Sequence, residues 1–394
     1  MRTLPQLLAS GDGRAFLESR GVFATEEAFV GRLQPPGRDG LTTLVGLDPK
    51  AFAVYAAHQI KSDYALSVVS KIRAAWDLDS RHSSVRSVLL WLEMDRAGSD
   101  KRTTGLNLRG RGGTLQVRFS SRRHDDKEVR FAPIERQQLD ETLRRLGAWA
   151  RQHGARAAER YAGLVEAVLS ENPTTLAELN MALTLFLLRE HLGVEASSIL
   201  ISDLAERGLL TEAIDDTVDR IDDVVTVFNA AIDSLASADV DPQVRPLGPD
   251  YLPLHYSCDR DGRRCTLIHE RQGTDHFAVT TCLCGAAYRF HLGAGSLSIG
   301  ELAETGRWSV DVTLPMYLND LASGVVAGQS SALYGLVLNE VLEKVLARPA
   351  IPMLVPEDLS TVLTSPSGAQ EVARSTPSAT AEAGSLLGEY LVSP

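Results

Sequence analysis

Two short, fully apolar segments constrain the fold of this chain more than any other feature. AFAVY (51–55) and VLLWLE (88–93) are each long enough for one strand, and a helical pattern runs between them from about Tyr64 to Trp76. Strands without polar alternation are typical of parallel sheets that helices cover on both faces. The sequence therefore predicts a βαβ-like unit and an α/β fold.

The remaining segments divide the chain further. Thr175 and Glu178 have the spacing of a capping box, and Gly193 fits the end of the helix that they would begin. The patterns predict an α/β core in two parts, a helical region, a cysteine-rich insertion of short strands and a disordered tail of small and polar residues. The expected bounds are 1–135 and 296–364 for the core, 136–240 for the helical region, 241–295 for the insertion and 365–394 for the tail.

Two stretches of the helical region repeat apolar residues at heptad spacing. The first runs from Leu139 to Ala157 among arginines, and the second from Ile214 to Leu235 among aspartates. Opposite charge on two apolar seams predicts a paired-helix arm. Ordinary packing against the domain core explains the spacing nearly as well.

Charge and hydropathy argue against some classes of function. The formal charge of −11 and the pI near 5.4 oppose a general nucleic-acid binder, since neutralising phosphates needs a surplus of Lys and Arg. The apolar runs are shorter than the roughly 20 residues that cross a bilayer, and the N-terminus lacks a signal-peptide core. We therefore expect a cytoplasmic protein that has neither membrane nor nucleic acid as a partner.

One basic stretch, Arg102–Arg123, contrasts with this acidic composition. Its guanidinium groups could face a phosphorylated or carboxylated small substrate. The sequence favours the other interpretation, a solvated hairpin whose charged edges discourage strand pairing.

Polar residues follow each predicted core strand, where open α/β sheets bind their ligands. After AFAVY come His58, Gln59, Ser62 and Lys71. His58 could transfer a proton near neutral pH, and Lys71 could reach a phosphate or a carboxylate. From spacing alone, the sequence favours the other interpretation, in which His58 and Lys71 are ordinary surface residues of a helix.

A second loop follows VLLWLE and places Asp95, Ser99, Asp100 and Lys101 on the same rim. Carboxylates near a lysine can act as a base, bind an amine or hold a metal ion, although Ala-Gly-Ser-Asp is also ordinary turn chemistry.

A third loop follows the predicted strand GVVAG (324–328), before a helix expected from about Ser331 to Ala347. Ser330 or Ser331 could cap that helix, and the small residues would let a ligand approach the backbone amides. Alone this signal is weak, because many α/β proteins have a strand, a glycine and a helix in this order.

Taken in order along the chain, these motifs resemble the bacillithiol synthase family, the cysteine-adding enzymes of bacillithiol biosynthesis. The likeness spans roughly residues 50–360 and covers a valine-tyrosine strand, a helix lysine, a tryptophan-leucine strand end with acidic residues, and a C-terminal stretch with a glycine loop, a tyrosine and a proline-rich strand. The residues that carry it are Val54, Tyr55, Gln59, Lys71, Trp91, Leu92, Glu93, Asp95, Trp308, Ser309, Leu314, Gly328, Tyr334 and Pro352.

The resemblance implies a Rossmann-like core related to class I aminoacyl-tRNA synthetases, with inserted connecting segments and a coiled-coil arm. The family's reaction joins cysteine to the amine of a glucosamine malate conjugate through an amide. Ala57 and His58 replace the family's glycine and first glutamine, and 95–98 replaces its acidic, histidine-containing cluster. We therefore carry over amide formation between an amino acid and an amine, and leave the amine open.

All four cysteines fall in one short window, which predicts a metal site in a small zinc-ribbon-like segment. Four thiolates suit tetrahedral zinc, whereas disulfides are less common in cytosolic chains. The gaps of six and one residues between paired ligands are unusual, and His255, His269 or His276 could replace a cysteine. The predicted ligands of a structural zinc are Cys258, Cys265, Cys282 and Cys284. A partly occupied or catalytic zinc and cysteines without a metal are the alternatives.

The sequence thus predicts a ligase that forms a carbon–nitrogen bond between an amino acid, cysteine among the candidates, and a small-molecule amine, with ATP or another nucleotide as a candidate cofactor. The predicted catalytic residues are His58, as the proton acceptor, with Asp95 and Asp100 positioning the amine. The predicted substrate- or nucleotide-binding residues are Gln59, Ser62, Lys71, Trp91, Ser99, Lys101, Gly328, Gln329, Ser330, Ser331 and Tyr334.

A carrier protein is a further candidate partner, and the chain could form a homodimer. The alternative function is that of a non-catalytic, zinc-containing, synthetase-like module that binds a carrier protein or tRNA.

Overall fold

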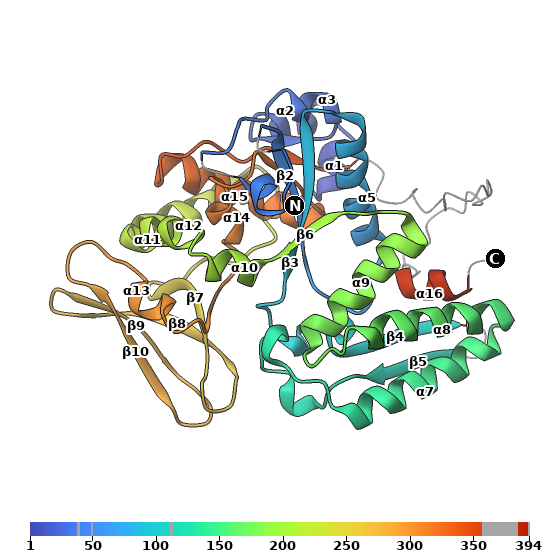
Figure 1. The fold of residues 1–394 in the computed structure, drawn as a ribbon. Coiled ribbons are helices and arrows are strands. Elements are labelled where there is room, and N and C mark those ends of the chain that lie inside the picture. The colour runs from blue at the N-terminus through green and yellow to red at the C-terminus, as the bar shows by residue number, and fades with distance from the viewer. Residues whose placement is uncertain (38–39, 49, 111–112, 357–384, 393–394) are drawn as a thin grey trace. The chain divides into compact units, whose positions relative to one another are not determined.

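The computed structural model describes residues 1–37, 40–48, 50–110, 113–356 and 385–392 (Figure 1). The chain divides into two compact units. Unit 1 comprises Met1–Ala57, Ala74–Leu90 and Ser197–Glu357, and unit 2 comprises His58–Arg73, Trp91–Ala196 and Asp358–Pro394. This division cuts the predicted helical region at Ser197 and assigns the predicted cysteine-rich insertion to unit 1.

A parallel six-stranded sheet forms the centre of unit 1, in the order β1-β13-β12-β2-β3-β6. The middle of β2 and most of β3 are buried; Val54 and Leu90, for example, are fully buried. The sheet confirms the predicted α/β, Rossmann-like class. The strands are β1 (Val22–Phe23), β2 (Phe52–Gln59), β3 (Val85–Leu92), β6 (Ser197–Leu200), β12 (Gly324–Val326) and β13 (Met353–Leu354).

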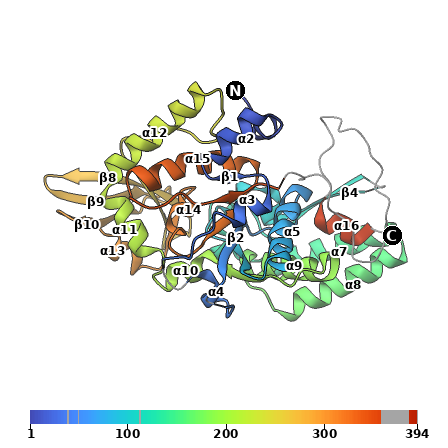
Figure 2. The ribbon, with the colours of Figure 1, turned by 90° about the horizontal axis from the view of Figure 1, so that it is seen from above.

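Helices flank this sheet, and Figure 2 shows α12 lying alongside α15. The apolar seam of α12 is buried, with Val224 and Phe228 fully inaccessible. The helices of this part are α1 (Leu4–Leu8), α2 (Gly11–Glu18), α3 (Glu26–Val30), α4 (Leu41–Leu44), α5 (Leu66–Arg81), α10 (Ile201–Glu206), α11 (Thr211–Asp219), α12 (Ile221–Ser237), α13 (Gly300–Ala303), α14 (Leu314–Tyr317) and α15 (Gln329–Lys344). The first half of α5, up to Arg73, belongs to unit 2.

A second sheet of unit 1 is antiparallel and follows the order β10-β9-β8-β7-β11. Because neighbouring strands alternate in direction, the β7–β8 and β9–β10 turns lie at the same end of this sheet. The strands are β7 (Tyr251–Ser257), β8 (Arg264–Gln272), β9 (Asp275–Thr281), β10 (Ala287–Gly293) and β11 (Trp308–Val310).

Unit 2 combines one hairpin with helices. α7 packs against α8 and β5 of the same unit, as α12 packs against α15 in unit 1. Both predicted heptad helices thus pack inside their own units, which agrees with the second interpretation, ordinary packing against a domain core. The elements are β4 (Gly105–Gly110), β5 (Gly113–Arg118), α6 (Lys101–Thr104), α7 (Arg136–Gln152), α8 (Ala155–Ser170), α9 (Leu176–Leu192), α16 (Leu386–Val392), and the 3-10 turns η1 (Ala97–Ser99), η2 (Arg122–His124) and η3 (Val129–Phe131).

The start and end of α9 are as predicted. Thr175 accepts a hydrogen bond from the amide of Glu178, whose carboxylate reaches back to the amide of Thr175, and Gly193 closes the helix with a left-handed φ of 64°. Both devices satisfy backbone groups that a helix leaves without partners at its ends.

The C-terminal end of the chain corrects one prediction. The expected disordered tail contains α16, whose Leu386, Leu387 and Leu391 are buried. The carboxylate of the fully buried Asp63 holds this helix start by accepting a hydrogen bond of 2.9 Å from the amide of Leu387. Residues 365–384 and 393–394 of the predicted tail lie outside the described residues.

Among the helices of the described residues, none combines the length and the apolar character that spanning a membrane requires.

Candidate functional site

The ends of β2 and β3 lead into a polar cluster of unit 2. His58 and Gln59 are the last residues of β2, and Asp95 lies shortly after β3. The side-chain amide of Gln59 donates a hydrogen bond to the carboxylate of Asp95, and the amide of Ile60 donates to the carbonyl oxygen of Leu92 at 3.2 Å. The structure thus brings the first and second predicted loops together.

Asp100 extends this cluster through an ion pair with Lys61. The Lys61 ammonium lies 2.8 Å from the Asp100 carboxylate, whose other oxygen accepts the amide of Arg102 and caps α6. Partial burial acts to raise the pKa of Asp100, but the hydrogen bonds from Lys61 and Arg102 outweigh it and hold that pKa below its usual value. Asp100 is therefore an ionised acceptor near neutral pH.

His58 is held neutral by its surroundings. Burial, and then the positive charges of Lys71 and Lys61, lower the pKa of His58 to about 3. Its Nδ1 lies 3.0 Å from the carbonyl oxygen of Gln59, and its ring meets that of Tyr64 edge-on at 5.7 Å. An uncharged imidazole can accept or donate a hydrogen bond, but it becomes protonated only at a high cost.

Lys71 lies on α5 and is 5% exposed. Burial, reinforced by the positive charge of Lys61, lowers the pKa of Lys71 to about 8. Part of the lysine population is then an uncharged amine near neutral pH, which is the state that accepts protons. Shifted acid–base groups of this kind concentrate at functional sites.

Other predicted residues of these two loops have different environments. The hydroxyl of Ser62 lies 2.6 Å from the carbonyl oxygens of Arg102 and Gly105, so it fastens the start of the β4–β5 hairpin. Trp91 is buried beside Tyr64. Ser99 and Lys101 are exposed.

The third predicted loop belongs to unit 1. Gly328, between β12 and α15, is the N-cap of α15, so the prediction that Ser330 or Ser331 caps this helix is wrong: both lie inside its first turn. Gln329 and Ser330 are exposed. Convergence of this loop with the other two stays a prediction.

Unit 1 also contains a pair of interacting buried tyrosines, Tyr55 on β2 and Tyr334 on α15. Burial, and then the charge of Tyr334, raises the pKa of Tyr55, and burial also raises that of Tyr334. The hydroxyl of Tyr55 is buried and has no hydrogen-bond partner among the described residues. A buried hydroxyl in this state usually has an ordered water or a ligand group as its partner.

The cysteines form a second candidate site, at the turns of the antiparallel sheet. Four donor atoms, those of Cys258, Asp261, Cys282 and Cys284, all lie within 4.8 Å of one another and could hold a metal ion. Cys258 follows β7 and Asp261 lies in the same turn, whereas Cys282 and Cys284 lie in the β9–β10 turn.

Distances in this cluster fit a compact tetrahedral ion. The sulfurs of Cys258 and Cys284 are 3.6 Å apart, and that of Cys282 is 3.5 and 3.6 Å from the two carboxylate oxygens of Asp261. Zinc–sulfur bonds of about 2.3 Å in a tetrahedron place two sulfurs roughly 3.8 Å apart. Cys265 packs against the cluster but is not one of these four donors, so Asp261 is the candidate ligand that the cysteine count missed.

The sequence signals for the missed residues were weak. Asp261 stands in the turn between Cys258 and Cys265, where an aspartate is ordinary turn chemistry. Lys61 and Tyr64 lie in the loop after β2, where Lys61 pairs with Asp100 and Tyr64 packs against His58. These contacts depend on the tertiary fold and leave no local pattern in the sequence.

No family model matches the chain, and no curated protein matches its sequence.

Proposed function

We propose that the protein is an amide-forming ligase, which joins the carboxyl group of an amino acid to the amine of a small molecule. The observation that carries this proposal is the meeting of the β2 and β3 ends in a cluster where the neutral His58 feels the charges of both Lys71, whose pKa is about 8, and the ionised Asp100. Amide formation needs what this cluster offers, namely a proton acceptor and carboxylates that bind an amine.

In the proposed reaction, the amine nitrogen attacks an activated acyl carbon, the bond to the leaving group breaks, and the nitrogen loses a proton. A general base works best when its pKa is close to the operating pH. Lys71 meets that condition, whereas His58 is a weak base. We therefore assign proton acceptance to uncharged Lys71 and a hydrogen bond to His58, while Asp95 and Asp100 orient the amine.

The start of α15, in unit 1, is a separate candidate segment for binding a carboxylate or a phosphate. This helix of sixteen residues presents unpaired amides at Gln329, Ser330 and Ser331, and such helix starts favour carboxylate and phosphate groups. ATP or another nucleotide would activate the carboxyl group, and the resemblance to cysteine-adding enzymes makes cysteine the first amino acid to test.

The test supplies the purified full chain with ATP, Mg²⁺, cysteine or a mixture of the other amino acids, and a panel of amino sugars. Mass spectrometry detects the amide product, and release of ADP or pyrophosphate is measured in parallel. Nucleotide turnover that depends on one amino acid and on one amine supports the proposal. Turnover that Lys71→Met and Asp100→Ala leave unchanged contradicts the assigned site.

The metal cluster favours a second candidate, a non-catalytic zinc-containing module that binds a carrier protein or tRNA. Three thiol groups and one carboxylate match zinc chemistry, and four protein ligands leave no open position for a substrate. We therefore propose a structural zinc at this cluster under either function. Binding of an aminoacylated carrier protein or tRNA, without any nucleotide turnover, would favour the module over the ligase.

A further inference from the structure

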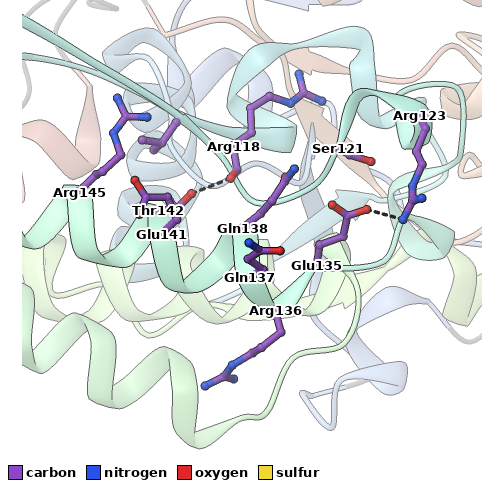
Figure 3. A pocket seen from close by; sticks show the side chains of 11 residues that line it. Arg118, Ser121, Arg123, Glu135, Arg136, Gln137, Gln138, Glu141, Thr142 and Arg145 are labelled. Atoms are coloured by element: carbon purple, nitrogen blue, oxygen red, sulfur yellow. Dashed lines mark hydrogen bonds and ion pairs between the residues drawn. The ribbon is translucent and has the colours of Figure 1, made fainter.

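A basic cavity of unit 2 lies outside both sites. It has a volume of about 930 Å³ and is formed by the end of β5, the residues that follow it and the first half of α7 (Figure 3). Four arginines line it: Arg118, Arg123, Arg136 and Arg145. In Figure 3, Arg136 points away from Arg118 and Arg145, so the side chains relevant to a ligand are the other three.

The carboxylates of the cavity are already paired. Glu135 lies 2.7 Å from Arg123, and Glu141 receives two hydrogen bonds, of 2.7 and 2.8 Å, from Arg144, which is not a lining residue. Burial acts to raise the pKa of Glu135, but the side chains of Ser121 and Arg123 lower it overall. The main partner of Glu141 is thus Arg144, and the charge of Arg145 contributes less to lowering the pKa of Glu141.

Two side chains that line the cavity have hydrogen-bonding groups without a partner among the described residues. Arg145 is exposed and makes no hydrogen bond or ion pair with the described residues, and the side-chain oxygen of Gln138 is buried without a hydrogen-bond partner among them. A guanidinium group has five donors in a planar fork that matches phosphate and carboxylate oxygens. The buried amide oxygen calls for a donor such as a hydroxyl group.

The cavity is built on rigid elements. Thr142 on α7 donates a 2.6 Å hydrogen bond to the carbonyl oxygen of Arg118 on β5, and both Thr142 and Val117 are buried. Arg118 is oriented by Asp125, with which it forms an ion pair. Preorganised groups lose little freedom when a ligand binds, so this arrangement suits recognition.

The charge around the cavity attracts anions, although the whole chain is acidic. Residues 58–73 and 91–196 contain twenty Lys and Arg against sixteen Asp and Glu, so the net charge of −11 comes from the rest of the chain. A local positive field of this kind raises the concentration of anions near it.

We propose that this cavity binds a small phosphate monoester that carries hydroxyl groups, such as a nucleoside monophosphate or a sugar phosphate. The phosphate contacts Arg118 and Arg145, and a hydroxyl donates to Gln138. The volume is that of a small-molecule site. A long polyanion such as RNA fits less well, because Glu135 and Glu141 would repel its continuous backbone charge.

The experiment is calorimetric titration of the full chain, at low ionic strength, with AMP, glucose 6-phosphate, inorganic phosphate and uncharged adenosine. Both monoesters are expected to bind once per chain and more weakly as salt is added, and adenosine is not expected to bind. Arg145→Ala should weaken binding about tenfold or more, and the double variant Arg118→Gln with Arg145→Gln should abolish it. A difference between AMP and glucose 6-phosphate separates the two ligand sources.

The matched control is Arg151→Ala, another exposed arginine of α7 that does not line the cavity, and it should leave binding unchanged. Lys71→Met should also leave it unchanged, which separates this site from the proposed ligase site. The proposal is overturned if no monoester binds, if Arg145→Ala has no effect, or if an RNA oligonucleotide binds while the monoesters do not.

Discussion

The polar cluster of unit 2 and the cysteine cluster of unit 1 differ in how their polar side chains are paired. In the first, the groups satisfy one another, as Lys61 does with Asp100 and Gln59 with Asp95. In the second, the donor atoms of three thiol groups and Asp261 lie within 4.8 Å of one another, and Tyr288 and Arg263 are further partners of Cys258 and Asp261. The polar cluster thus has its partners within the protein, whereas the cysteine cluster could hold a metal ion, which the proposed structural zinc would supply.

Metal removal should produce the largest effect and should affect unit 1 alone. Treatment with a strong chelator, or the substitution Cys258→Ser, is expected to take the zinc content from one per chain to none and to remove amide exchange protection from β7–β10. Structural zinc contributes about 10 kcal/mol or more in isolated zinc-finger peptides, and less is expected here because the sheet has its own buried residues.

Elemental analysis and hydrogen exchange measure this outcome, and the amides of α7 to α9 serve as the internal control. If the protein keeps both its amide protection in β7–β10 and its melting temperature after chelator treatment, the cysteine cluster needs no metal ion. The proposed difference between the two clusters is then wrong.

Lys71→Met tests whether the polar cluster serves catalysis and not stability. Turnover in the ligase assay should fall by about 100-fold or more, the range that general bases contribute. The melting temperature at pH 7 should stay or rise, because methionine removes a charge whose burial is unfavourable. Lys50→Met is the control, since Lys50 is exposed and lies outside the proposed site. A large loss of stability would show that Lys71 is structural.

The pH dependence of stability should also separate Lys71 from its surroundings. Its pKa falls from 10.5 in the unfolded chain to about 8 in the folded one, so between these values the unfolded state binds more protons. The free energy of unfolding should therefore gain about 3 kcal/mol from this residue as the pH rises from 8 to 10.5.

Chemical denaturation at pH 7.5 and pH 10.5 measures this gain as the difference between the wild-type chain and Lys71→Met. Equal pH dependence in the two proteins would mean that Lys71 titrates as an exposed lysine does.

Much of the fold could be read from the sequence, because apolar runs and caps are local signals. The runs 51–55 and 88–93 became central parallel strands, and Thr175 and Gly193 bound α9 as their chemistry requires. The tail was misjudged because its composition is polar overall, whereas four apolar or aromatic residues close to the C-terminus bury α16.

The sites were predictable only in part. Strand ends identified where His58 and Asp95 would lie, because the carboxyl ends of parallel strands share one edge. The pKa shift of Lys71 depends on burial by segments distant in sequence, which no local pattern reports. Asp261 was missed for a related reason, since counting cysteines ignores a carboxylate that only the fold of a turn brings to the same point.

The smallest expected effect concerns the choice between Asp261 and Cys265 as the fourth ligand. Asp261 places carboxylate oxygens 3.5 and 3.6 Å from the sulfur of Cys282, whereas the sulfur of Cys265 lies 3.5 Å from the carbonyl oxygen of Arg263. Cys265→Ser should therefore leave the zinc content at one per chain and change the free energy of unfolding by less than about 1 kcal/mol.

Asp261→Asn is the matched variant and should weaken zinc binding about tenfold or more, because it replaces an anionic ligand by a neutral one of the same shape. Competition with a chromogenic chelator ranks the two proteins. The opposite order, with Cys265→Ser the weaker binder, would identify the site as a four-cysteine zinc ribbon. Asp261 would then interact with the thiol groups only through hydrogen bonds. The metal ligands would be the four cysteines that the sequence predicted.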